Sequence, residues 1–143
     1  MWGFVIALVS GALMSIQGVF NTEVTKSSSV WVANAWVQIT AFAVCMAAWF
    51  FTGRESFTAI FSVSHKYMLL GGAIGAFITW TVIQSMTYLG PAPAVLVIVV
   101  SQITVAYLIE VFGLFGVEKT EFAWQKLLGL FLAVAGIFIF QRK

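Results

Sequence analysis

Six side-chain amides fall within the apolar stretches of this chain, where a polar group is costly unless it meets a hydrogen-bonding partner. They are Gln17, Asn21, Asn34, Gln38, Gln84 and Gln102, and Trp80 precedes Gln84 by one helical turn. Two pairs are spaced four residues apart, so each pair would share one helix face. Amides offer neutral hydrogen bonds, and an indole ring adds a surface for stacking a flat or cationic group. These residue types indicate a binding site for a small polar molecule.

The depth of these groups follows from the short loop expected at residues 25–29. Asn21 and Asn34 would lie nearest that side of the membrane, with the second member of each pair about one turn deeper. Gln84 falls in the same half, and Gln102 lies close to the middle of its stretch. The pattern predicts an amide-rich, aromatic-lined zone in one leaflet. The alternative is that the amides only join neighbouring helices, at roughly 0.6 kcal/mol per contact.

Glu110 is the one carboxyl group well inside an apolar run, because seven uncharged residues separate it from Glu118. If the helix extends to Phe115, Glu110 lies about 8 Å below the membrane surface, at 1.5 Å per residue. Burial would favour reversible proton binding, as an ion-coupled transporter requires. If the helix instead ends at Phe112, the carboxylate reaches headgroup water. Glu110 is therefore the candidate proton-coupling group, with both depths open.

Other reactive side chains favour structural roles. Glu23 precedes Lys26 by three residues at an expected helix end, which predicts an interfacial ion pair. Cys45 has no second cysteine to pair with, and His65 falls in a polar connector. The sequence has no Asp, no metal-spaced His/Cys cluster and no nucleotide-binding glycine pattern. We therefore expect no enzyme, metal or cofactor, and a net charge of +2 gives no basis for a nucleic-acid partner.

The elements that must position these groups are membrane-spanning helices. Hydrophobic residues make up 62% of the chain and charged residues 8%, with a mean hydropathy of +1.03, whereas a soluble domain has roughly 25% charged residues. A span needs about 20 apolar residues, and the first stretch is too long and too poor in positive charge for a signal peptide. We expect an all-α bundle of five transmembrane helices in one domain, residues 1–143, with spans near residues 2–22, 30–52, 67–89, 92–115 and 123–140.

The longest stretch without a charged residue runs from residue 67 to residue 109 and is broken by Gly90, Pro91 and Pro93. Glycine favours a helix end, and proline is tolerated in the first turn of the next helix. A tight transmembrane hairpin is therefore predicted. Residues 56–66 carry phenylalanines at helical spacing and predict a short helix lying in the membrane interface.

Five spans would place the termini on opposite sides of the membrane. Four Lys or Arg residues then fall on the N-terminal side and three on the other: Arg54, Lys66, Lys119 and Lys126 against Lys26, Arg142 and Lys143. Orientation follows Lys/Arg asymmetry, so this near balance allows two interpretations. Either other features fix the orientation, or the chain inserts both ways and pairs with an inverted copy. The small residues Gly129, Ala133 and Gly136 of the last span are the candidate dimer contact.

Four blocks of sequence carry a family resemblance. They are Gly11 with Gln17-Gly18 and Asn21; Gly71-Gly72-Ala73-Ile74-Gly75-Ala76; Gln102 with Ile109-Glu110-Val111-Phe112-Gly113-Leu114-Phe115-Gly116; and Leu127-Leu128-Gly129 with Ala135-Gly136. Together they resemble the YdcZ-like family of short bacterial membrane proteins in the drug/metabolite transporter superfamily, over nearly the whole chain. This chain differs at Ser101, where glycine is usual, and at Glu110, where aspartate is usual. The carboxyl group is retained.

The resemblance implies a five-helix half-transporter of the bacterial inner membrane, similar to one inverted repeat of a ten-helix transporter. We expect a dimeric secondary transporter for a small polar or zwitterionic/cationic metabolite, formed by an antiparallel homodimer or with a similar short chain. Its cavity would be lined by Gln17, Asn21, Asn34, Gln38, Trp80, Gln84 and Gln102, with Glu110 as the coupling group. The alternative is a non-transporting subunit that regulates or assembles a larger membrane complex.

Overall fold

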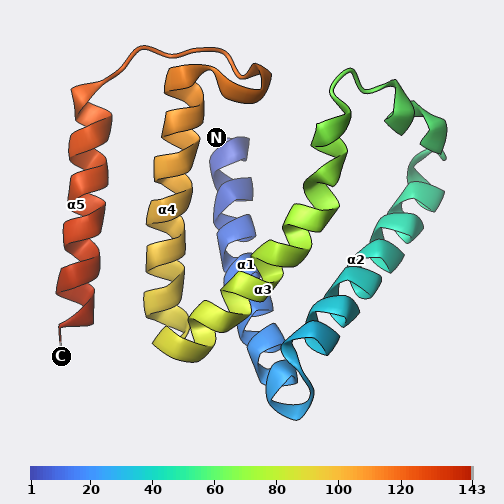
Figure 1. Ribbon diagram of the computed structural model, residues 1–143, viewed down its shortest axis with the longest axis horizontal. Helices are drawn as coiled ribbons and strands as arrows, with labels where there is room; N and C mark the ends of the chain where they lie inside the picture. The colour runs from blue at the N-terminus through green and yellow to red at the C-terminus, as the bar shows by residue number, and fades with distance from the viewer. Residues whose placement is uncertain (143) are drawn as a thin grey trace. The chain divides into compact units, whose positions relative to one another are not determined.

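The computed structural model describes residues 1–142 and is all-α (Figure 1). Its long helices are α1 Trp2–Ser27, α2 Val30–Thr52, α3 Gly71–Leu89, α4 Pro91–Phe112 and α5 Trp124–Gln141. Short 3-10 helices lie in the connections: η1 Phe57–Ser62, η2 Lys66–Leu70 and η3 Leu114–Gly116. With η2 counted as the start of the third span, all five helices are long and apolar enough to cross a membrane. The predicted all-α fold with five spans is confirmed.

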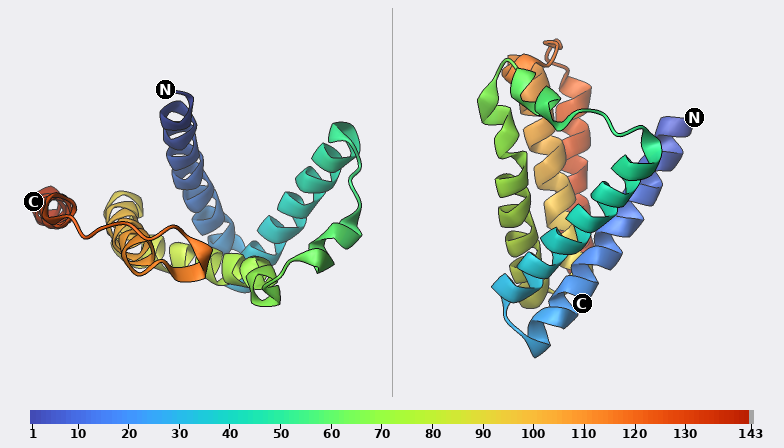
Figure 2. Two further views of the ribbon diagram at one scale, coloured as in Figure 1. Left: turned by 90° about the horizontal axis from the view of Figure 1, so that it is seen from above. Right: turned by 90° about the vertical axis from the view of Figure 1, so that its right-hand side faces the viewer.

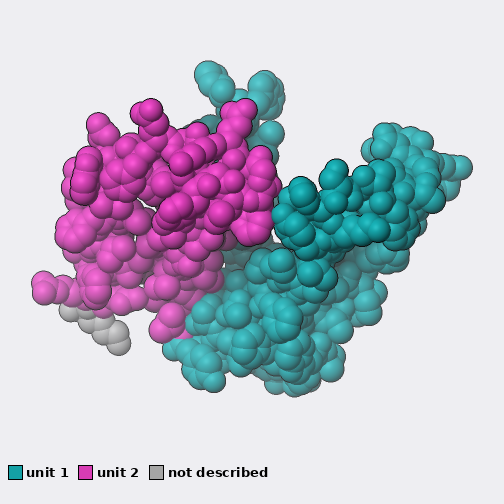
Figure 3. All heavy atoms as spheres, turned by 45° about the horizontal axis from the view of Figure 1, so that its top comes forward, with its two compact units in different colours: residues 1–88 teal, residues 89–143 magenta. Residues whose placement is uncertain are grey.

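The chain divides into two compact units, coloured teal and magenta in Figure 3. Unit 1, Met1–Tyr88, holds α1, α2, η1, η2 and α3, whereas unit 2 begins at Leu89 and holds α4, η3 and α5. Most large apolar side chains in both units are exposed. Such surfaces suit helices that face lipid rather than water.

Helices α1 and α2 form a hairpin whose connection is only residues 28–29. The Oγ of Ser29 accepts a hydrogen bond from the backbone N–H of Val32 at 3.3 Å, which satisfies one donor that a helix start leaves free. Helix α1 continues past the exit expected near residue 22, and there Lys26 Nζ lies 2.6 Å from Glu23 Oε1. The predicted ion pair is confirmed. From their connection the two helices diverge (Figure 2).

Helix α3 packs against α1 where a glycine leaves room for a methionine. A Cβ added to Gly18 would overlap the end of the Met86 side chain, 2.7 Å from its Sδ, and would lie 3.4 Å from Val82 Cγ1. Gly18 and Met86 are both buried. Small residues allow helices to approach closely in lipid, where dispersion contacts rather than the hydrophobic effect hold them together. Gly18 therefore fixes how closely α1 and α3 approach.

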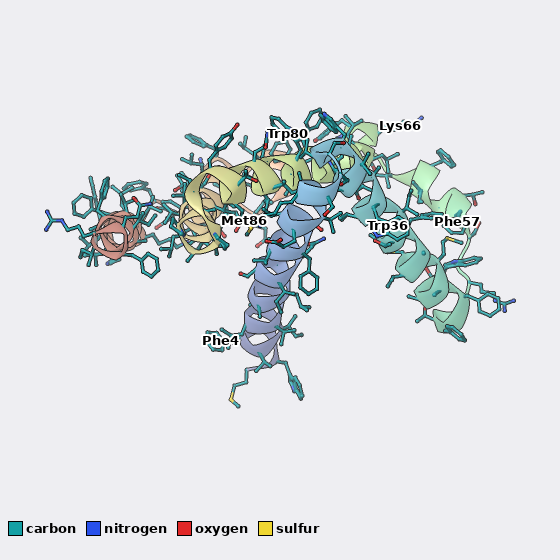
Figure 4. All side chains as sticks on the ribbon, turned by 90° about the horizontal axis from the view of Figure 1, so that it is seen from below. Phe4, Trp36, Phe57, Lys66, Trp80 and Met86 are labelled. Atoms are coloured by element: carbon teal, nitrogen blue, oxygen red, sulfur yellow. The ribbon has the colours of Figure 1, made fainter. Side chains whose placement is uncertain are left out.

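The connector between α2 and α3 folds back onto the end of α2. The rings of Trp49 and Phe57 lie 4.8 Å apart, and Trp49 Nε1 donates to the backbone carbonyl of Glu55 at 2.8 Å. Phe57 and Phe61 remain exposed on η1, and Phe57 and Lys66 mark the two ends of the connector in Figure 4. The short helix predicted for residues 56–66 is present as the 3-10 helix η1, Phe57–Ser62.

The helix boundary predicted around Gly90 is also present. Helix α3 ends at Leu89, Gly90 has a φ of +83° that favours glycine, and α4 begins at Pro91 with both prolines in its first turn. Proline is tolerated there because the first N–H groups of a helix have no partner within it.

Helix α4 ends at Phe112, the shorter of the two alternatives considered for this span. Gly113 takes a left-handed conformation, with φ +64°, and its N–H donates to the carbonyl of Glu110 at 3.3 Å. The N–H of Thr120 donates to the same carbonyl at 3.0 Å, so the following loop folds back on the helix end. A left-handed glycine that bonds to the last turn is a common helix stop, which explains why the helix does not reach Phe115.

Replacing Gly18 by leucine should destabilise the protein, because the new side chain must displace Met86 from its packed position. Overpacking of this kind costs about 1–3 kcal/mol, and thermal unfolding in detergent would measure it. Gly11→Leu is the matched control, since a Cβ at Gly11 of the same helix meets nothing within 4 Å. Equal effects of the two substitutions would contradict the packing described, whereas adding Met86→Ala to Gly18→Leu should restore part of the loss.

Candidate functional site

Asn34 joins α2 to α3. Its Nδ2 donates to the backbone carbonyl of Ala76 at 2.7 Å, and the residue is only 3% exposed. Gln38 Nε2 lies 3.5 Å from Asn34 Oδ1, at the outer limit of a hydrogen bond. The two amides therefore share a face of α2, as their spacing predicted, and Asn34 clamps that face to α3.

Two indole rings extend this contact. The rings of Trp31 and Trp80 are stacked with their centroids 6.1 Å apart and their planes 14° apart. Trp31 precedes Asn34 by three residues, and Trp80 follows Ala76 by four, so the stack and the Asn34 bond lie about one turn apart. We call this cluster of Trp31, Asn34, Gln38, Ala76 and Trp80 the α2–α3 patch.

Figure 4 shows Trp80 and Met86 on different sides of α3. Trp80 faces the start of α2 through its stack with Trp31, and Met86 faces α1 at Gly18. Helix α3 therefore uses separate faces for its two neighbours. Trp36, labelled on α2 in the same figure, is 61% exposed and takes no part in the indole stack.

The other predicted amides of unit 1 have free side chains. Asn21 is only 8% exposed, Gln84 is half-buried and Gln17 is exposed. The Asn21 backbone carbonyl accepts from Thr25 Oγ1 at 2.8 Å, but no hydrogen bond within residues 1–142 engages the side-chain amide of any of these three residues. Within the same residues Thr120 Oγ1 is the one enclosed side-chain atom without a partner, so the Asn21 amide still opens to its surroundings. These amides are available to a partner from outside unit 1.

Unit 2 holds the two remaining predicted residues, and it does not bring them together. Gln102 is exposed on α4, and its amide makes no hydrogen bond within the described chain. Glu110 Oε2 lies 3.2 Å from Lys126 Nζ, and their side chains are 43% and 49% exposed, respectively. The predicted coupling group is therefore one half of an ion pair that joins α4 to the first turn of α5.

Sequence reasoning placed Lys126 at the membrane surface but missed its pairing with Glu110, together with the role of Tyr107. Lys126 Nζ lies 5.1 Å from the centre of the Tyr107 ring, within the range of a cation–π contact. The Tyr107 hydroxyl accepts from the backbone N–H of Ala123 at 2.9 Å and lies 3.3 Å from the Ala123 carbonyl. The sequence contained one signal from which this ion pair could have been predicted: Glu110 and Lys126 have opposite charges and lie near the adjacent ends of two consecutive spans.

A cavity of about 440 Å³ lies between α4 and α5. The two helices lie side by side and run antiparallel (Figure 1), and the Glu110–Lys126 pair sets their register. The residues that line the cavity are Ile103, Ala106, Tyr107 and Glu110 of α4 and Lys126, Gly129, Leu130 and Ala133 of α5. The small face predicted as a dimer contact thus lines an intrachain cavity through Gly129 and Ala133. Within residues 1–142 no cluster of His, Cys, Asp or Glu could hold a metal ion.

Replacing Asn34 by leucine should destabilise unit 1 by about 1 kcal/mol, because the hydrogen bond between α2 and α3 is lost. The midpoint of thermal unfolding in detergent would report the change. Thr81→Val is the matched control, since the Thr81 hydroxyl bonds only to carbonyls of its own helix, at 3.0 and 2.9 Å. If Asn34→Leu were as harmless as the control, the clamp would contribute nothing to stability.

Residues 2–139 match a family model described as "Putative inner membrane exporter, YdcZ". No curated protein and no solved structure matches the chain. The match covers α1 to α4 and all but the last two residues of α5, and the predicted membership and inner-membrane location are confirmed. The chain belongs to the YdcZ family of inner membrane exporters and is a multi-pass membrane protein with a role in transport.

Proposed function

We propose that this chain is one subunit of a dimeric secondary transporter that exports a small polar or zwitterionic/cationic metabolite, with proton exchange at Glu110. The observation that carries the proposal is the set of amides without partners, above all Asn21. Asn21 is only 8% exposed, and no side-chain hydrogen bond engages its amide within residues 1–142. The amide is not enclosed, so its two N–H donors and its carbonyl oxygen can reach a substrate or water beside unit 1.

The substrate class follows from the groups on offer. Asn21, Gln17 and Gln84 present neutral donors and acceptors, and the α2–α3 patch presents stacked indole rings of which Trp31 is 57% exposed. An indole face attracts a cation and stacks on a flat group. In this proposal Asn34 and Gln38 hold the patch in place and border the substrate. Gln102, on α4 of unit 2, is the further candidate for hydrogen bonding to the substrate.

A second chain completes the proposed site. A five-helix chain corresponds to one half of an inverted-repeat transporter, whose substrate lies where the halves meet near the midplane. The nearly equal number of Lys and Arg residues on the two sides permits insertion in both orientations. We therefore favour an antiparallel homodimer, or a heterodimer with a similar short chain.

Glu110 is the proposed coupling group because its carboxyl group takes part in the contact that joins α4 to α5. Lys126 is its ion-pair partner, and both side chains are nearly half exposed, so the pair contributes little to stability and can break during transport. Protonation of Glu110 would remove the attraction and release Lys126.

Asn21→Leu should reduce the rate of substrate transport across the membrane of proteoliposomes by roughly five- to tenfold, because one hydrogen bond of about 1 kcal/mol to the substrate is lost. The measurement is flux across a panel of labelled polar, zwitterionic and cationic metabolites. Gln125→Leu is the matched control, since this amide is exposed in the first turn of α5, outside the proposed site. Wild-type protein that moves no member of the panel would contradict the proposal and favour the non-transporting alternative.

Glu110→Gln should abolish the part of the flux that depends on an imposed pH gradient, because glutamine keeps the shape of the side chain but cannot exchange a proton. Flux with and without the gradient, in the same proteoliposomes, measures this part. Glu118→Gln, an exposed residue in the loop after α4, is the control and should leave it intact. A full pH response in Glu110→Gln would exclude Glu110 as the coupling group.

A further inference from the structure

The cavity between α4 and α5 has chemically distinct ends. Glu110 and Lys126 form one end, and Ile103 and Ala133 form the other. Seven residues along α4 separate the two ends, which is about 10 Å at 1.5 Å per residue. The cavity is therefore short and amphipathic, with both charges at one end.

The charged end lies at the level of the membrane surface. Glu110 is two residues from the end of α4, and Lys126 lies in the first turn of α5. Trp124 lies in the same first turn of α5 as Lys126, with its ring centroid 5.3 Å from that of Phe122, and the Tyr107 ring lies 5.1 Å from Lys126 Nζ. Aromatic rings of this kind gather at headgroup depth, so the apolar end points toward the hydrocarbon core.

The ion pair leaves both of its members with unused capacity. Glu110 uses one carboxylate oxygen, Oε2, and Lys126 uses one of its three N–H donors. Because both side chains are nearly half exposed, a ligand can reach the free oxygen and the free donors at once. A ligand that matches both free groups has a head group with an anion and, a few atoms away, a cation that carries N–H donors.

We propose that the α4–α5 cavity is a specific binding site for a zwitterionic aminophospholipid. Its phosphate accepts from Lys126, its primary ammonium donates to Glu110, and one acyl chain runs past Gly129 toward Ala133. The four charges then alternate in sign, and charge-assisted hydrogen bonds join them. The proposal does not depend on what the protein transports.

The charged end of the cavity distinguishes a lipid from a helix of a second copy as its occupant. Glu110 and Lys126 together call for a ligand that carries both signs of charge, whereas Gly129, Ala133 and Gly136 of a second copy would offer only small apolar groups. An acyl chain is slender enough to enter along its length, and a Cβ at Gly129 meets nothing within 4 Å.

Native mass spectrometry of the full chain in detergent tests the site. The protein is offered equal amounts of phosphatidylethanolamine, phosphatidylcholine and phosphatidylglycerol with the same acyl chains. We expect phosphatidylethanolamine to be retained roughly fivefold over phosphatidylcholine, whose quaternary ammonium has no N–H to donate, a ratio equivalent to about 1 kcal/mol.

Glu110→Gln should remove this preference, and Gly129→Leu should lower retention of all three lipids by filling the apolar end. Gly136→Leu is the control on the same helix, because its Cβ also meets nothing within 4 Å and the residue does not line the cavity.

Two results would overturn the proposal. One is equal retention of the three lipids by the wild-type chain, a comparison that needs no variant to fold. The other is a loss of self-association in Gly129→Leu with lipid retention unchanged, which would make the cavity a contact between copies. Transport assays on the same preparations separate this outcome from failure of the proposed export function, because lipid retention is measured without any substrate.

Discussion

The structure depends on one constraint: within hydrocarbon, each polar group must find its partner inside the protein or in a cavity. The backbone meets it by forming helices, and the Ser and Thr hydroxyls meet it locally, as Thr22 does by donating to the Gly18 carbonyl at 2.8 Å. An amide cannot be satisfied in this way within its own turn, because it carries two donors and a strong acceptor. The partner of each amide therefore shows whether that helix face packs against another helix or is free to bind another molecule. Asn34 has found its partner in α3, and Asn21 has none within the described chain.

Unit 2 meets the same constraint at its ends rather than in the middle of its spans. The loop after α4 is tied back through the Glu110 carbonyl and the Tyr107 hydroxyl, and the two charges of the cavity face each other across the helix ends. These contacts lie where water and headgroups can reach them. The apolar part of the cavity needs no polar partner, which explains how small residues can line it without a cost in unsatisfied groups.

The positions of the spans could be predicted from the sequence because they depend on one dimension, the length of each charge-free stretch. Gly90 and Pro91 marked a helix boundary for equally local reasons. The rotation of each helix about its axis could not be predicted in this way, since apolar residues surround every span and no amphipathic stripe distinguishes a packed face. That rotation decides that Asn34 meets Ala76 whereas Asn21 stays free, and that Gly129 faces a cavity. The partner of Glu110 depended on register as well, which Gly113 sets by ending α4 early.

The two polar contacts that join helices differ in the free energy needed to break them. Asn34 is 3% exposed, so parting it from Ala76 would leave an amide buried without a partner, at about 1–3 kcal/mol. Glu110 and Lys126 are nearly half exposed, and an ion pair of that kind contributes about 0–1 kcal/mol because water takes the place of either partner. Helices α2 and α3 should therefore move as one body, whereas the contact between the ends of α4 and α5 can open and close at little cost. Each contact therefore sets how freely the helices of its own unit can move against each other.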